Sequence, residues 1–205
     1  MQAVDFIFSI AILIMSIVIH EVSHGYVANA LGDPTAKYAG RLTLNPLKHL
    51  DPFGSVILPT ITYLLGGFIF GWARPVPYNP YNLKNQRWGP AIVGAAGPLA
   101  NIFVAVTFGL MIRANEFLFL PQGFLQIATT IVFINLILAI FNFVPIPPLD
   151  GSKVLFALLP YKWSYVEDFL ERWGLMLLLI FIFFFFRMIL PIVFFAFRAI
   201  TGLGF

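Results

Sequence analysis

The feature that most constrains this chain is a pair of histidines inside a long apolar segment. Residues 19–25 read Ile-His-Glu-Val-Ser-His-Gly, within an apolar run from Phe6 to about Ala30. Roughly 20 apolar residues are enough to cross the hydrocarbon of a bilayer as a helix. On such a helix His20 and His24 lie one turn apart on the same face, so both imidazoles can reach one metal ion.

The residue that follows the first histidine indicates what a metal ion would do there. Glu21 completes the H-E-x-x-H arrangement of zinc hydrolases. In those enzymes the metal lowers the pKa of a water molecule and the glutamate takes its proton. A purely structural polar cluster is the alternative, but ionisable side chains are costly in hydrocarbon and usually serve a function there. We therefore predict a catalytic metal site with His20 and His24 as ligands and Glu21 as the general base.

The composition predicts a membrane protein built of helices. Of the 205 residues, 60% are hydrophobic and 10% charged, and the mean hydropathy is +0.91. Soluble domains carry roughly a quarter charged residues. The longest polar stretches, at about 31–52 and 74–88, are loop-sized. We expect an all-α polytopic membrane protein with about four to six transmembrane helices.

These segments predict one membrane domain over residues 1–205. We expect a catalytic core at about 6–160, a C-terminal membrane segment at about 173–205, and no soluble accessory domain. Arg187 and Pro191 interrupt the last apolar run, so it could form one membrane segment or two.

The charges and the missing cysteines exclude several classes of function. The net charge of +3 comes from Lys and Arg residues that flank the apolar segments, and this pattern orients membrane proteins. It gives no reason to expect nucleic-acid binding. With no Cys there is no disulfide, no thiol nucleophile and no cysteine zinc ligand, so metal ligands must come from His, Asp and Glu.

A catalytic zinc site needs a third protein ligand besides the two histidines. His49 is the third histidine, but it falls in a polar loop, and Ala30 occupies the place where an extended form of the motif has its third histidine. Asp150 is a better candidate because it ends a proline-rich turn just where an apolar segment leaves the membrane. It could equally be the N-cap of a helix that starts at Gly151. The residues alone leave both roles open.

Three motifs together resemble those of the site-2 protease family of intramembrane zinc metalloproteases, peptidase family M50. They are H-E-x-x-H at 20–24, G-P-x-x-N at 97–101 and N-x-x-P-x-P-x-x-D-G at 142–151. The resemblance implies that Asp150 is the third ligand of one zinc ion per chain, with Glu21 as the base. It also implies that Asn101 and Asn142 hold substrate or the transition-state oxyanion. By residue type alone, an Asn in a span more often makes hydrogen bonds between helices.

The ligands also constrain how the chain crosses the membrane. All three must meet at one depth, so an even number of crossings separates the first helix from Asp150. Three apolar segments lie between them, and 53–72 is the weakest because Pro59 and a Gly-Gly pair interrupt it. We predict a re-entrant element at 53–72, with basic loops on both sides of it in the cytoplasm and the metal site toward that face.

We therefore expect an integral, multi-pass zinc endopeptidase in the plasma membrane of a prokaryotic cell. It would cut peptide bonds within or near transmembrane segments, with membrane proteins as substrates and the bilayer as its surroundings; a homo-oligomer is a further possibility. The alternative is a metal-transport protein that uses the same ligands without proteolysis, and Glu21→Gln distinguishes the two. A set of two His and one carboxylate can also hold iron.

Overall fold

In the computed structural model, residues 3–51, 53, 57, 61 and 74–203 are described, and every regular element among them is helical. Four helices in this part of the chain are long and apolar enough to cross a membrane: Ile7–Ala30, Gly89–Arg113, Gln122–Asn142 and Tyr161–Thr201. The expected all-α polytopic fold is thus confirmed. The re-entrant element predicted at 53–72 lies almost entirely outside the described residues, so it stays a prediction.

The long helices are α1 (Ala3–Ala30), α4 (Gly89–Arg113), α6 (Gln122–Asn142), α8 (Ser164–Ile180) and α9 (Ile189–Thr201). Short elements join them: α2 (Thr35–Tyr38), α5 (Asn115–Leu118) and α7 (Asp150–Leu158), with 3-10 turns at Pro46–Lys48, Pro80–Asn82 and Tyr161–Trp163.

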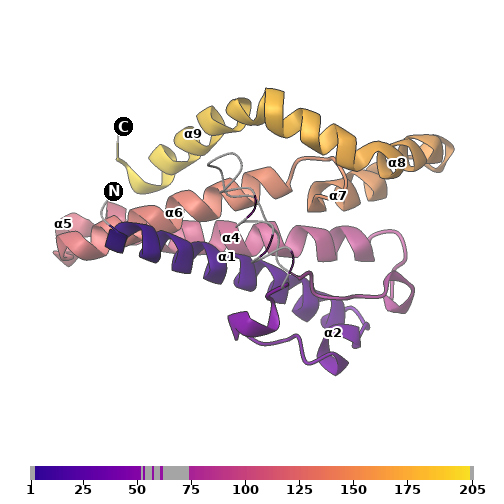
Figure 1. Cartoon of the computed structure of the whole chain (residues 1–205), viewed down its shortest axis with the longest axis horizontal. Coiled ribbons are helices and arrows are strands. Elements are labelled where there is room, and N and C mark those ends of the chain that lie inside the picture. The colour runs from indigo at the N-terminus through magenta and orange to yellow at the C-terminus, as the bar shows by residue number, and fades with distance from the viewer. Residues whose placement is uncertain (1–2, 52, 54–56, 58–60, 62–73, 204–205) are drawn as a thin grey trace.

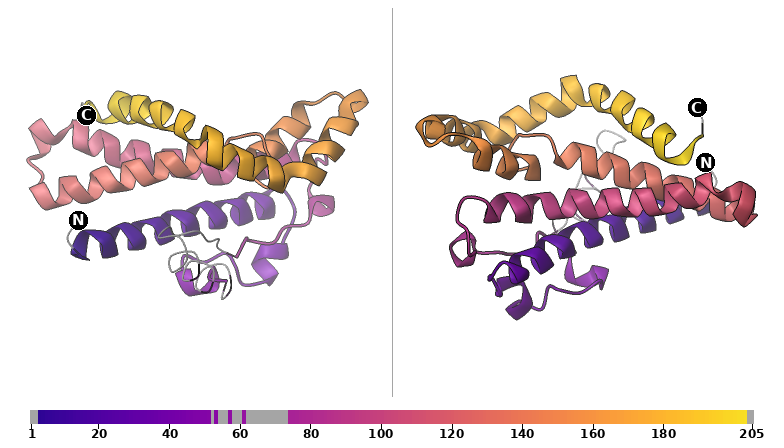
Figure 2. Two further views of the ribbon diagram at one scale, coloured as in Figure 1. Left: turned by 45° about the horizontal axis from the view of Figure 1, so that its top comes forward. Right: turned by 180° about the vertical axis from the view of Figure 1, so that it is seen from behind.

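Helices α1, α4 and α6 run side by side, and α9 crosses over α4 and α6 (Figures 1 and 2). The start of α1, the end of α9 and the short α5 lie at one end of the bundle, which we name the α5 end. Helices α2 and α7 lie toward the other end, which we name the α7 end. Helix α4 is central, because it packs against α1, α6, α7 and α9.

Small residues let these helices approach one another closely. The main apolar core lies between α4, α6 and α9, where Ala105 and Ala128 are fully buried. A β-carbon on Gly109 of α4 would collide with Ile200 of α9. In a bilayer, where lipid is as apolar as the side chains, such close backbone packing is a main source of helix association. The remaining buried core residues are Ile112, Val132, Leu136, Ile189, Val193 and Phe197.

The C-terminal run is one continuous but bent helical path (Figure 1). Between α8 and α9 the chain passes through a π-helical turn at Phe181–Phe185 and a 3-10 turn at Phe186–Met188. Pro191 falls in the first turn of α9, where a proline costs no helical hydrogen bond. The 41 residues of this path would extend about 60 Å, roughly twice the hydrocarbon thickness. The polar start of α8 therefore has room to lie outside a single crossing.

A buried carboxylate fixes the loop where α1 ends. Gly32 has φ 109, a conformation that glycine adopts without strain, and the chain turns there. Asp33 follows with no exposed surface, and its carboxylate accepts hydrogen bonds from Thr35, from the backbone N–H of Asn79 and from the side chain of Asn82. The loop that precedes α4 is thereby held against the exit of α1.

Candidate metal centre

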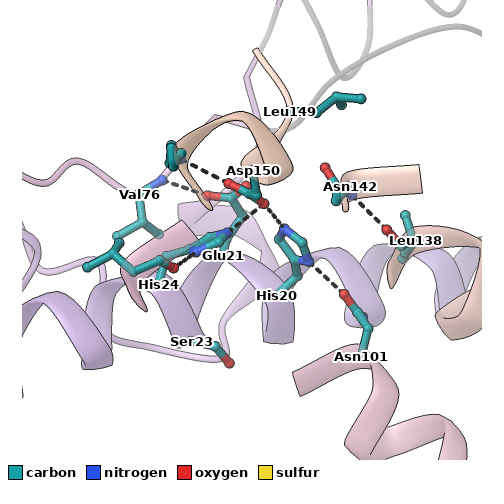
Figure 3. Close-up of polar contacts among 12 residues, drawn as sticks. His20, Glu21, Ser23, His24, Val76, Asn101, Leu138, Asn142, Leu149 and Asp150 are labelled. Carbon is teal, nitrogen blue, oxygen red and sulfur yellow. Dashed lines mark hydrogen bonds and ion pairs between the residues drawn. The ribbon is translucent and has the colours of Figure 1, made fainter. Parts of the chain in front are cut away.

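Three side chains from two distant parts of the chain converge at the α7 end. His20 and His24 project from one face of α1, and Asp150 is the first residue of α7 (Figure 3). One carboxylate oxygen, Asp150 Oδ2, lies 3.0 Å from His20 Nε2 and 3.1 Å from His24 Nε2. All three residues are at least 93% buried. Among the described residues they form a group of ligand atoms that could hold one metal ion.

The geometry fits a small tetrahedral ion. Zinc binds His nitrogen and carboxylate oxygen at about 2.0–2.2 Å, so neighbouring ligand atoms in a tetrahedral site lie about 3.3 Å apart. The two separations above come within a few tenths of an ångström of that value. Two histidines and one carboxylate also leave a fourth position for water or substrate, as catalytic zinc sites do.

Each imidazole is oriented by an acceptor on its other nitrogen. His20 Nδ1 donates to Asn101 Oδ1 at 2.6 Å, and His24 Nδ1 donates to the backbone carbonyl of Val93 at 2.6 Å. Both acceptors belong to α4. Because each Nδ1 carries the proton, each Nε2 keeps its lone pair toward Asp150, which is the arrangement that metal-binding histidines use.

Gly97 provides the space for these nitrogens. A β-carbon at this position of α4 would lie 2.5 Å from His24 Nε2 and 2.6 Å from His20 Nε2. The first residue of the G-P-x-x-N motif therefore gives room to the two imidazoles, and its last residue, Asn101, lies one turn further along α4 and bonds His20. This assigns a physical purpose to the spacing of the motif.

Asp150 does not act as a helix cap. The residue before it, Leu149, is the N-cap of α7 and makes no side-chain cap, and the Asp150 carboxylate turns to the histidines instead. Its second oxygen, Oδ1, accepts a hydrogen bond from Lys153 Nζ at 2.9 Å. Burial by itself favours the neutral acid, whereas the Lys153 ammonium group favours the carboxylate, which is the form that binds a metal ion.

Glu21 lies beside the three candidate ligands at the wall of a small cavity. Its Oε2 accepts a hydrogen bond from the backbone N–H of Val76 at 2.8 Å. The cavity has a volume of about 190 Å³ and is lined by the three ligands, Glu21, Pro75, Val76, Tyr78, Asn142, Pro148 and Lys153. A carboxylate in this position can exchange a proton with a molecule bound in the cavity.

The two predicted substrate-binding asparagines occupy different settings. Asn142 lines the cavity, and its Nδ2 donates to Leu138 O within α6 (Figure 3). Asn101 is fully buried behind His20, with its amide hydrogen-bonded to protein groups. The remaining histidine, His49, lies in a separate contact, where its Nε2 donates to Thr43 O at 2.8 Å.

Several residues of the site escaped the sequence analysis. Lys153 could have been found, because it falls three residues after Asp150 on a helix and so shares its face. Val76 contributes a backbone N–H, which carries no signal in the sequence. Asn135 and Ser16, which contact Asn101, belong to no motif considered above and are recognisable only as polar residues within spans.

Comparisons with known proteins agree with this geometry. The sequence profile described as "Peptidase family M50" matches residues 8–117 and 111–185. "Putative zinc metalloprotease YwhC" of Bacillus subtilis is 41% identical over 154 residues, which cover 72% of this chain and 67% of that protein. "Putative zinc metalloprotease Rip2" of Mycolicibacterium smegmatis is 34% identical over 160 residues, which cover 73% of this chain and 56% of that protein. No solved structure is a significant match.

The family match supports Zn²⁺ as the metal, and His20, His24 and Asp150 are a possible site for it. The family that the three motifs predict is thus confirmed. The chain belongs to peptidase family M50, the site-2 protease family, and is a zinc metalloprotease with apolar helices of membrane-spanning length.

Proposed function

We propose that this chain hydrolyses peptide bonds inside the membrane, within or near the transmembrane segments of other membrane proteins. The observation that carries the proposal is the depth of the ligand group. His20 lies ten residues before the end of the spanning helix Ile7–Ala30, which places it about 15 Å from that end. That is about half the hydrocarbon thickness. A peptide bond cut there would come from a substrate segment in the bilayer.

Charge supports the orientation of the site toward the cytoplasm of a prokaryotic cell. The loops at the α7 end carry most of the basic residues: Lys37, Arg41, Lys48, Arg74, Lys84, Arg87 and Lys162. The connection between α4 and α6 at the α5 end contains Glu116 and no Lys or Arg between residues 114 and 122. Loops rich in Lys and Arg stay on the cytoplasmic side.

In this proposal His20, His24 and Asp150 hold the zinc ion. When bound, zinc supplies Lewis acidity, which lowers the pKa of a water and polarises a substrate carbonyl. Glu21 faces the same cavity and takes the proton of the attacking water, then gives it to the leaving amine. Asn142 lines the cavity, and in this proposal its amide turns away from Leu138 O and donates a hydrogen bond to the substrate.

In this proposal residues 74–76, which adjoin the cavity, exchange their present contacts for contacts with the substrate. The Val76 N–H is bound to Glu21 and the Arg74 N–H to His49 O, while Arg41 donates to the Arg74 carbonyl at 2.7 Å. An extended substrate that pairs with residues 74–76 as an added strand would need to displace these contacts. The Val76 N–H would then be released together with the carboxylate of the base.

Metal content and cleavage, measured together, test the proposal. Purified chain should contain about one zinc, which Asp150→Ala loses and Glu21→Gln keeps. In proteoliposomes, wild type should cut a panel of single-span membrane proteins that Glu21→Gln leaves intact. If Glu21→Gln proteoliposomes instead carry zinc across the bilayer as fast as wild type and neither cuts the panel, the ligands serve metal transport. If zinc remains after Asp150→Ala, the third ligand lies elsewhere.

A further inference from the structure

A buried chain of polar side chains runs from the ligand His20 into the middle of the bundle. It joins Ser16 of α1, Asn101 of α4 and Asn135 of α6. Asn101 and Asn135 have no exposed surface, and Ser16 is 4% exposed. Buried amides at membrane depth must be hydrogen-bonded within the protein. The two amides lie on the side of His20 that faces away from the cavity, where they cannot contact a molecule bound there.

The direction of the Asn101 amide determines whether His20 can bind a metal. With the carbonyl Oδ1 toward His20, as found at 2.6 Å, His20 Nδ1 must carry the proton and Nε2 keeps its lone pair. With the amide reversed, the NH₂ group would face Nδ1, and the proton would move to Nε2. That second tautomer cannot bind zinc through Nε2. If the Asn101 amide could adopt both orientations, part of the protein would hold His20 in the tautomer that cannot bind zinc, and zinc binding would be weaker.

Two backbone carbonyls, those of Ser16 and Ile131, fix the orientation of the two amides. Asn101 Nδ2 donates to the Ser16 carbonyl at 3.2 Å and to Asn135 Oδ1 at 2.7 Å. Asn135 Nδ2 donates to the Ile131 carbonyl at 2.9 Å and to Ser16 Oγ at 2.9 Å. Carbonyls only accept, so each NH₂ group must point where it does, and all four amide N–H donors are used. Reversing either amide would bring its oxygen against a backbone carbonyl, so that two buried acceptors would face each other without a proton between them.

We propose that Asn135 and Ser16 are positioning residues of the metal centre, which act through Asn101 to hold His20 in the tautomer that binds zinc. This inference rests on the metal centre of the proposed function. It assigns to α6 a part in metal binding, although α6 contributes no ligand. The bland alternative is that the amides only fasten three helices together, which is a common use of Asn in spans.

The test is zinc affinity of the metal-free chain in detergent, measured by competition with a chromophoric chelator. Loss of a partner behind a ligand typically costs 10–100-fold in metal affinity. We expect Asn101→Ala to weaken zinc binding by that amount and Asn135→Leu by about tenfold. Thr201→Val is the control, since it removes a buried side-chain hydrogen bond, to Phe197 O, that is remote from the metal site. It should leave zinc affinity unchanged.

A double variant separates positioning from fastening. If Asn135 acts through Asn101, adding Asn135→Leu to Asn101→Ala should weaken zinc binding no further, and additive losses would contradict the proposal. Cobalt-loaded Asn135→Leu should also show an altered visible spectrum. If Asn135→Leu lowers only the unfolding temperature and keeps wild-type zinc affinity, the amides are fasteners and the inference is wrong. Failure of the metal centre itself would appear differently, as wild-type zinc that does not depend on Asp150.

Discussion

Gly97 lies so close to His24 that a single methyl group on Gly97 would overlap the imidazole nitrogen that faces the metal site. The β-carbon of an alanine at position 97 would lie 2.5 Å from His24 Nε2, well inside van der Waals contact. The helix that carries Gly97 thus forms the floor of the metal centre, and it can do so only where a side chain is missing.

Gly97→Ala should therefore abolish zinc binding while the chain stays folded. The methyl group would force both Nε2 atoms away from Asp150, and the ligand separations leave no slack for that shift. The measurement is zinc per chain in purified protein. Gly123→Ala on α6 is the control, because a β-carbon there meets nothing within 4 Å. Stoichiometric zinc in Gly97→Ala would show that the ligands lie elsewhere.

His49→Ala should leave zinc at about one per chain but destabilise the protein. His49 is 1% exposed, its Nε2 donates to Thr43 O, and its own carbonyl accepts from the Arg74 N–H. Truncating the His49 side chain leaves a cavity and removes the hydrogen bond to the Thr43 carbonyl, at a cost of about 1–3 kcal/mol in the free energy of unfolding. Zinc analysis beside thermal unfolding checks both halves, and His20→Ala, by contrast, should lose the zinc. A loss of zinc in His49→Ala would make it a ligand.

Asp33 should make the loop at the exit of α1 sensitive to acid. Burial by itself raises the pKa of this carboxyl, but hydrogen bonds from Thr35, Asn82 and Asn79 outweigh it and lower the pKa below its usual value. A lowered folded-state pKa means that the stabilisation is fully present above the unfolded value, about 3.9, and is lost as pH falls through the folded value.

We therefore expect Asp33→Asn to lower the unfolding temperature at pH 7, with a deficit that shrinks as the pH falls below about 4. Limited proteolysis of the 31–84 region gives a second readout. Glu116→Gln, which removes an exposed carboxylate at the α5 end, serves as the control for a general loss of negative charge. A deficit for Asp33→Asn that stays constant across this pH range would mean that the carboxylate is not the stabilising form.

Gly109→Ala should destabilise the contact between α4 and α9 without removing zinc. Its methyl group would collide with Ile200, and overpacking of this kind typically costs about 1–3 kcal/mol. Ile200→Ala in the same chain should restore part of the lost stability by making room. Unfolding in mixed detergent–denaturant solutions measures both. If Gly109→Ala is neutral alone, α9 packs less closely than the structure indicates.

Local sequence was enough to predict a zinc metalloprotease and to propose most of its metal site. His20 and His24 occupy a single helix, so their spacing alone fixes one shared face, and Glu21 adjoins the first of them. The apolar runs likewise predict the spanning helices, because bilayer thickness sets their length. Asp150 was reached from the sequence only as one of two readings, and the family resemblance favoured the ligand over the cap.

Tertiary structure decided everything that depends on two helices meeting. The distance of Asp150 from the histidines, the space left by Gly97, and the hydrogen bond from Val76 to Glu21 all join residues more than 50 positions apart. Such contacts are set by the packing of distant helices and loops, and sequence periodicity describes only one helix at a time. For the same reason the sequence did not indicate the contact of Asn135 with Asn101, because an Asn in a span usually makes hydrogen bonds between helices whose partners the sequence does not identify.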